Sequence, residues 1–142
     1  MIAVYISCSK NPGVFQKAKA KWAICAYDDK GMLKDKREGV AIALKSTCKR
    51  ASLIALRDAL LRFNKPAPIT FYIEDPFVRN MLKTNMPYRW STHNWRKFRY
   101  DREIKNLELW REVYSLIKKH AVKFAGPEDL ARNKQLKEME VR

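Results

Sequence analysis

The sequence predicts an α/β fold in which a mixed β-sheet carries helices on both faces. First, short apolar runs separated by turn residues fill the first third of the chain, which is typical of antiparallel strands. Second, from Thr47 onward helical periodicity alternates with single β runs, which indicates crossover connections. Third, a chain of 142 residues with 46% hydrophobic side chains can bury a sizeable core. We expect one domain that spans residues 1–142.

Three strands are predicted before the first helix. Residues 2–6 form a nearly unbroken apolar run, which suits a strand that is buried on both faces in the middle of a sheet. The polar residues that follow this run should therefore reach the sheet edge. Two further strands are expected at residues 21–27 and about 33–44, joined by a hairpin turn in which Gly31 supplies a positive φ.

The middle of the chain predicts helices that alternate with a strand. Thr47 is a suitable N-cap for a helix that runs to about Phe63, where a segment rich in proline stops it. A short β run covers residues 69–73. Pro76 then opens a helix that runs to about Lys83, since proline is tolerated in the first turn.

The last third predicts two helices, a strand and a terminal helix. Residues 85–87 break the preceding helix, and a short helix is expected at residues 91–98. Asn106 caps an amphipathic helix whose apolar residues recur three and four positions apart. A strand at residues 120–124 and a helix opened by residues 126–129 complete the order β-β-β-α-β-α-α-α-β-α.

Positive charge is the strongest global signal in the composition. Thirty Lys and Arg residues against fifteen Asp and Glu residues give a net charge of +15, which favours a polyanionic partner such as nucleic acid. Between Pro76 and Lys105, eight basic and two acidic residues are interleaved with six aromatic residues. Cationic and aromatic side chains in one segment suit phosphate contact together with packing against sugars or bases. A basic protein that its charge merely keeps in solution is the alternative.

The sequence shows no pattern of membrane insertion or export. No apolar run approaches the ~20 residues of a membrane helix, and the N-terminus lacks the pattern of an export signal. Cys8, Cys25 and Cys48 are an odd number of cysteines, which favours buried thiols in a reducing compartment over a disulfide framework. We therefore expect a cytoplasmic, intracellular protein without a membrane partner.

Five sequence fragments, in the same order and on matching predicted elements, resemble type 1 ribonuclease H over nearly the whole chain. The sharpest are residues 93–97 and 105–110, which resemble the basic protrusion and the following helix of the bacterial enzymes. Residues 11–13, 77–79 and 126–128 resemble the turn after the family's first strand, the helix start after its fourth strand and the loop before its last helix. The resemblance implies a ribonuclease H-like fold with a five-stranded mixed sheet.

The resemblance also implies where catalytic carboxylates would stand. In the family, several carboxylates hold two divalent ions that support hydrolysis of the RNA strand of an RNA:DNA hybrid, and Mg²⁺ or Mn²⁺ requires oxygen ligands. The four expected positions fall on Ser7, Ser52, Glu74 and Asn133. Glu74 alone matches, so it would be the one metal ligand of a degenerate site. We expect no cofactor, or Mg²⁺ or Mn²⁺ if the protein is active.

Positions that contact nucleic acid in the family are better retained. Asn11 and Thr47 occupy positions that contact the nucleic-acid backbone in the family. Lys49 and Arg50 add charge at the start of the helix that follows Thr47, where backbone N–H groups already favour phosphate. The protrusion would present a further set of cationic and aromatic side chains, namely Trp90, Arg96, Lys97 and Arg99.

Several aromatic residues have a structural interpretation beside the functional one. Trp95 and Trp110 are interpreted as core anchors, while Trp90 is left open between the core and the nucleic acid. His93 and His120 are isolated in the sequence, and we expect packing or capping roles for them.

Three functions follow from this pattern. The first is a non-catalytic ribonuclease H-like protein that binds an RNA-containing duplex, either an RNA:DNA hybrid or double-stranded RNA, through its basic aromatic protrusion. The second is an active ribonuclease H with a rearranged site that uses Glu74, Asp75 and Asp129. The third is a protein-interaction scaffold whose positive charge meets an acidic protein partner.

Overall fold

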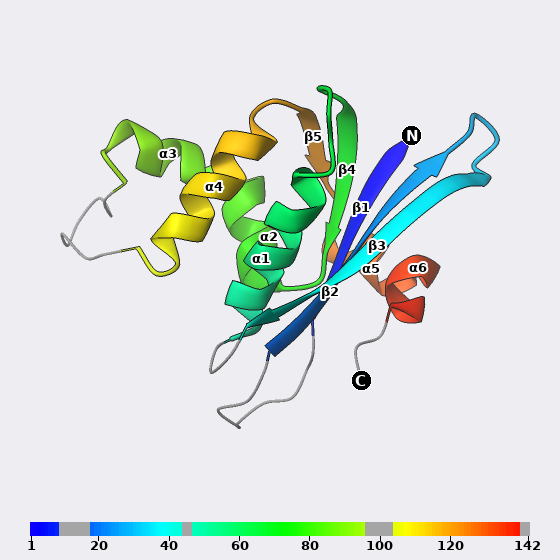
Figure 1. Ribbon diagram of the computed structural model, residues 1–142, viewed down its shortest axis with the longest axis horizontal. Coiled ribbons are helices and arrows are strands. Elements are labelled where there is room, and N and C mark those ends of the chain that lie inside the picture. Colours follow the sequence, from blue (N-terminus) through cyan, green and yellow to red (C-terminus); the bar gives the residue numbers. More distant parts are fainter. Residues whose placement is uncertain (9–17, 44–46, 96–103, 140–142) are drawn as a thin grey trace.

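A five-stranded mixed sheet forms the centre of the computed structural model, which describes residues 1–8, 18–43, 47–95 and 104–139 (Figure 1). The sheet order is β3-β2-β1-β4-β5. Strands β1, β2 and β3 form an antiparallel meander, and β4 and β5 are added in parallel. The predicted α/β class and the five-stranded mixed sheet are confirmed. The strand bounds are β1 Ile2–Cys8, β2 Ala18–Tyr27, β3 Leu33–Ala43, β4 Pro68–Ile73 and β5 Ala121–Phe124.

Strand β1 is the central strand of the sheet, as its apolar run predicted. It pairs antiparallel with β2, where Ile6 faces Trp22, and parallel with β4, where Ile6 faces Ile73. All its residues after Ile2 are buried. Because β1 and β4 run in parallel, their carboxyl ends meet at the same edge of the sheet. This edge is where the candidate site is built.

Helices cover the two faces of the sheet unequally (Figure 1). Four helices pack on the face to which β1 directs Val4 and Ile6, and two short helices pack on the face of Ala3 and Tyr5. Their bounds are α1 Cys48–Leu60, α2 Pro76–Lys83, α3 Met86–Thr92, α4 Leu107–Ile117, α5 Pro127–Arg132 and α6 Lys134–Glu138. Among the described ranges, no helix has the length and apolarity to span a bilayer.

Two predicted helices differ from the observed ones. The helix expected at residues 91–98 lies earlier, as α3, because Pro87 occupies the first turn of α3 and does not merely end the helix before it. The single terminal helix is two helices, α5 and α6. They are divided at Asn133, whose backbone is extended and whose side-chain Oδ1 accepts a hydrogen bond from Leu136 N at 3.1 Å. An asparagine that caps a new helix in this way interrupts the previous one.

Candidate nucleic-acid interface and carboxylate site

The structure brings Ser7 and Glu74 together at the joined ends of β1 and β4. Glu74 N donates a hydrogen bond to Ile6 O at 2.9 Å, which extends the pairing of the two strands by one step. Ser7 Oγ donates to Glu74 Oε2 at 3.3 Å. Ser7 is only 2% exposed, whereas Glu74 is half-buried. The first and third of the four expected positions therefore share one site.

Asp75 has a structural role as the N-cap of α2. Its Oδ1 accepts a hydrogen bond from Val78 N at 3.0 Å, and Asp75 is the N-cap residue of α2. The buried Arg79 of the same helix donates from Nη1 to Ile73 O at 3.1 Å. Asp75 and Arg79 together fix the start of α2 against the end of β4. This capping role orients the Asp75 carboxylate toward the helix backbone.

Ser52 is buried in the layer between α1 and the sheet. It is 1% exposed, and its Oγ has no hydrogen-bond partner within the described residues. Ser52 follows Cys48 by one helical turn, so both side chains lie on one face of α1. The Cys48 thiol interacts with the thiol of Cys8 on β1, and burial together with this contact raises the pKa of Cys8. No hydrogen bond joins Ser52 to the Ser7–Glu74 pair among these residues.

Two predicted site residues, Asp129 and Asn133, lie near the C-terminal end, Asp129 on α5 and Asn133 between α5 and α6. Asn133 lies beside Tyr5, because its side chain is one of the groups that act on the pKa of the Tyr5 hydroxyl. Tyr5 and Ser7 point to the same face of β1, so Asn133 approaches the face that carries Ser7. Asp129 is exposed in the first turn of α5.

These donors do not fit a pair of divalent cations. Two dications in close proximity need several anionic oxygens. The site offers the Glu74 carboxylate, a Ser7 hydroxyl that already donates to it, and an Asp75 carboxylate that caps α2. Within the part of the chain that the structure describes, no group of three or more His, Cys, Asp or Glu side chains could hold a metal ion.

The first turn of α1 is a cationic surface that carries no acidic residue. Thr47 caps this helix as predicted, since its Oγ1 accepts a hydrogen bond from Arg50 N at 3.3 Å. Lys49 is exposed, and its Nζ lies 4.3 Å from the centroid of the Phe77 ring on α2. Phe77 is itself 40% exposed. An ammonium group and an exposed aromatic face are thus presented together, close to the strand end that carries Glu74.

Arg50 links α1 to α4. Its Nη1 donates to Glu108 Oε1 at 2.6 Å and to Asn106 Oδ1 at 3.1 Å. The hydrogen bond from Arg50 holds the pKa of the Glu108 carboxyl below its usual range. Asn106 is the residue before α4 as predicted, but its side chain accepts from Arg50 and does not cap the helix. Arg50 is therefore partly neutralised by contacts within the protein.

The burial of Trp90 corrects its assignment as a nucleic-acid contact. Trp90 is 4% exposed, and its ring meets the Trp110 ring edge-on with 5.5 Å between the centroids. It is a core residue that supports α3 against α4. Trp95 is half-buried against Tyr114, as its interpretation as an anchor suggested, and the Arg111 guanidinium lies over its ring.

Four of the predicted nucleic-acid contacts fall on residues that the structure does not describe. Asn11, Arg96, Lys97 and Arg99 lie outside the described residues. The sequence interpretation did not identify the pairing of Lys49 with Phe77. The two residues belong to different helices, and only the crossover through β4 brings those helices together. A phenylalanine directly after Pro76, at the start of a predicted helix, is the local signal in the sequence for it.

Comparison with known proteins places these features in one family. The family model for RNase H matches residues 3–126 of the chain. A ribonuclease H from Caldicellulosiruptor saccharolyticus is 32% identical over 120 residues, which cover 83% of this chain and 74% of that protein. A ribonuclease H from Chlorobium phaeobacteroides (strain BS1) is 29% identical over 119 residues, with coverage of 83% and 74%.

Solved structures share the fold at low sequence identity. LC9-RNase H1, described as a type 1 RNase H with the type 2 active-site motif, superposes with a TM-score of 0.76 at 18% identity, covering 97% of this chain and 67% of that chain. RNase H1 from the archaeon Halobacterium salinarum gives a TM-score of 0.54 at 18% identity, with coverage of 95% and 92%. The matched family region ends before α5, so Asn133 and Asp129 lie beyond it.

Proposed function

This chain belongs to the RNase H family, and on that premise we propose that it is a non-catalytic member that binds an RNA-containing duplex, either an RNA:DNA hybrid or double-stranded RNA. The observation that supports this proposal most is a contrast within one region. The Ser7–Glu74 pair offers a single carboxylate, while the nearby start of α1 presents Thr47 and Lys49 to solvent.

The start of α1 has the chemistry of a phosphate contact. Unpaired backbone N–H groups at a helix N-terminus favour anions, and the first turn of α1 contains no acidic side chain to oppose them. The exposed Lys49 adds a point charge, and Phe77 beneath it adds an apolar surface for a sugar or a base. These groups recognise a phosphate backbone irrespective of base sequence.

The same region lacks the charge that two-metal hydrolysis needs. Glu74 is the matched carboxylate, and Ser7 and Ser52 replace acidic residues with neutral hydroxyls. A neutral ligand does not compensate the repulsion between two dications, so the ions would not be held at the separation that the reaction requires. We therefore expect bound duplex to remain intact in the presence of Mg²⁺ or Mn²⁺.

A binding and cleavage experiment on the same samples tests the proposal. A fluorescently labelled RNA:DNA hybrid, double-stranded RNA and double-stranded DNA of equal length are titrated with the protein at 50 and 200 mM KCl, and anisotropy is measured. We expect affinity for the RNA-containing duplexes to fall steeply with salt, and gels of the same mixtures with 5 mM Mn²⁺ to show no cleavage. Absence of binding at 50 mM KCl would contradict the proposal.

Substitution of Lys49 tests whether the start of α1 is the interface with the duplex. Lys49→Gln removes one phosphate contact, so we expect severalfold weaker binding and a salt slope that is smaller by about one. Lys137→Gln on α6 removes the same charge from an exposed position on the opposite face of the sheet and is the matched control. Equal losses for the two variants would indicate attraction to net charge without a defined surface.

An active enzyme with a rearranged site is the second candidate. The observation in its favour is the 32% identity to a protein named ribonuclease H. In this case Glu74, with Asp75 and Asp129 as further carboxylates, would hold one Mg²⁺ or Mn²⁺ ion. Cleavage of the hybrid in Mn²⁺ that disappears in Glu74→Gln, while duplex binding is retained, would establish the enzyme and exclude the non-catalytic proposal.

A further inference from the structure

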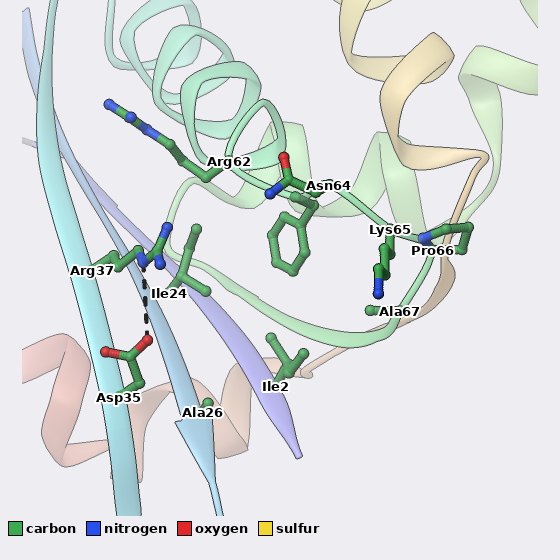
Figure 2. A pocket seen from close by; sticks show the side chains of 11 residues that line it. Ile2, Ile24, Ala26, Asp35, Arg37, Arg62, Asn64, Lys65, Pro66 and Ala67 are labelled. Atoms are coloured by element: carbon green, nitrogen blue, oxygen red, sulfur yellow. Dashed lines mark ion pairs between the residues drawn. The ribbon is translucent and has the colours of Figure 1, made fainter.

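A second candidate site lies at the opposite end of β1 from the Ser7–Glu74 pair. It is a cavity of about 370 Å³ between β3, the start of β1 and the loop that joins α1 to β4 (Figure 2). Ile2 lines it at the start of β1, and Ser7 is five positions further along the strand, which is roughly 17 Å at ~3.3 Å per residue. We call this cavity the β1-start pocket. Its volume is within the range of small-molecule sites.

The residues that line the β1-start pocket include more cations than acids, and Figure 2 shows the Arg62 guanidinium at its rim, directed away from Ile2 and Asn64. Arg37, Arg62 and Lys65 line it together with one acidic residue, Asp35. The ion pair from Arg37 Nε to Asp35 Oδ2 is long, at 3.9 Å, and its side chains are 66% and 68% exposed, so it contributes little and can exchange for another anion. The Arg62 guanidinium lies over the Trp22 ring at 5.7 Å from its centroid, which limits the conformations of its planar fork.

The interior of the β1-start pocket is apolar. Ile2, Ile24 and Phe63 contribute to its wall. Phe63 is itself held by an edge-on contact with the His120 ring, with 5.2 Å between the centroids. Next to Phe63, the exposed Asn64 adds an amide that can both donate and accept hydrogen bonds. Figure 2 shows Arg37 and Asp35 on the β3 side and Asn64 to Ala67 along the loop that closes the other side.

We propose that the β1-start pocket binds a nucleoside monophosphate group, with the base against the apolar wall and the phosphate between Arg37 and Arg62. An aromatic heterocycle matches the apolar wall and the Asn64 amide, and guanidinium groups bind phosphate oxygens in a bidentate manner. Each half of the ligand matches a different part of the pocket, since the wall of Ile2, Ile24 and Phe63 has no charge to bind a phosphate and the guanidinium groups lie apart from that wall on β3 and just after the end of α1. This site does not depend on duplex binding through α1.

Calorimetric titration with AMP, adenosine and inorganic phosphate tests the chemistry of the ligand. We expect saturable binding of AMP to the complete protein at low salt, and affinities at least tenfold weaker for adenosine and for phosphate. Proton NMR locates the ligand, because the chain has two histidines and the His120 ring lies behind Phe63. AMP should shift the His120 ring signals and leave those of His93 unchanged. Phosphate that binds as tightly as AMP, or unshifted His120 signals, would overturn the proposal.

Substitutions separate the pocket from general attraction to positive charge. Arg62→Gln and Arg37→Gln should each weaken AMP binding roughly tenfold, since each removes one charge-assisted hydrogen-bonded pair with the phosphate. Arg37→Gln leaves the contact between Arg62 and Trp22 in place, so it remains informative if Arg62→Gln lowers stability. Arg132→Gln on α5 removes the same charge from an exposed helix and should leave AMP affinity unchanged. An equal loss in Arg132→Gln would refute the site.

The monophosphate could belong to a free mononucleotide or to the end of a strand. Competition between AMP and short single-stranded oligonucleotides with and without a 5′-phosphate distinguishes these sources. Displacement by the phosphorylated strand alone assigns the pocket to strand ends, and displacement by neither strand assigns it to free nucleotides. Lys49→Gln should weaken duplex binding without changing AMP affinity, so this proposal and the proposed function fail independently.

Discussion

At the joined ends of β1 and β4, Glu74 lies opposite a serine hydroxyl. Two carboxylates at such a distance repel each other, and the pair is stable only when one is protonated or a cation lies between them. Ser7 changes this balance because its hydroxyl donates a hydrogen bond to the Glu74 carboxylate. The pair is therefore electrostatically satisfied without an ion. This pairing is the physical argument behind the proposal that the chain binds nucleic acid without catalysis.

Ser52 shows the opposite situation at another of the four positions where the resemblance implies a carboxylate. A buried hydroxyl without a partner costs about 1–3 kcal/mol, whereas the Ser7 hydroxyl has an acceptor. We expect Ser52→Ala to raise the free energy of unfolding by about 1 kcal/mol and the melting temperature by roughly 3 °C. Ser7→Ala should lower the free energy of unfolding by about 1 kcal/mol through loss of the hydrogen bond to Glu74.

Urea unfolding of both variants at pH 7 measures these changes. The two substitutions delete the same atom from buried positions, so each is the control for the other. A destabilisation in Ser52→Ala as large as that in Ser7→Ala would mean that the Ser52 hydroxyl is paired in solution, with an ordered water as the candidate partner.

Residue identity alone predicted some of these roles better than others. The sequence predicts Thr47 as an N-cap, because a threonine directly before a segment with helical periodicity can accept a hydrogen bond from a backbone N–H of the first turn. The sequence does not decide the role of Trp90, since a tryptophan among basic residues suits both a core and a base-stacking surface. Its edge-on contact with Trp110 depends on the packing of α3 against α4. A contact of this kind is a property of tertiary structure and has no local signature.

Element boundaries were predictable where a capping or turn residue marks them. The hairpin at Gly31 has φ of 79°, and α2 has the predicted bounds Pro76–Lys83. The errors occurred where one residue type permits two outcomes. The sequence predicts that Pro87 ends a helix, whereas Pro87 lies in the first turn of α3. It also predicts one terminal helix, whereas Asn133 divides α5 from α6. Local propensity does not decide such cases, because packing against neighbouring elements does.

His120 connects two segments that are distant in the chain, and its titration should make stability depend on pH. Its Nδ1 accepts a hydrogen bond from Ala67 N at 3.0 Å, which joins the end of α4 to the loop before β4. Burial, with the nearby Lys119 as a smaller cause, lowers the pKa of His120 below its usual value of 6.5. The unfolded chain therefore binds more protons than the folded one near pH 6, so stability rises with pH there.

We expect the contribution of His120 to be fully present above pH ~6.5 and to be lost as pH falls through the lower folded pKa. His120→Asn keeps an acceptor at the position of Nδ1 and removes the titration. The slope of unfolding free energy against pH between 5 and 7 should be smaller in this variant, by no more than ~1.4 kcal/mol per pH unit. The two proteins are identical at every other position, so the contribution of those positions to the slope cancels in the comparison. Parallel slopes would show that His120 is not the titrating group.

At the scale of the whole molecule, the net charge of +15 acts on folding and on binding in opposite directions. Like charges on one compact body repel each other and reduce its stability, whereas the same charges attract a polyanion. Salt screens both effects, since the Debye length falls from about 10 Å at 0.1 M to about 3 Å at 1 M. A rise in salt should therefore stabilise the isolated protein and weaken its complex with nucleic acid.

Thermal melts against KCl concentration test this opposition. Without duplex, we expect the melting temperature to rise between 50 and 500 mM KCl. With saturating RNA:DNA hybrid, it should be higher at 50 mM, because a ligand that binds only the folded state stabilises it, and it should fall with salt until the two curves meet. KCl is preferred to sulfate salts, since excluded anions stabilise proteins by another route.

Two outcomes would contradict this expectation. If the hybrid raises the melting temperature by the same amount at all salt concentrations, the binding energy comes from contacts other than those between cationic side chains and phosphates. A melting temperature of the isolated protein that falls with salt would show that its ion pairs outweigh its self-repulsion.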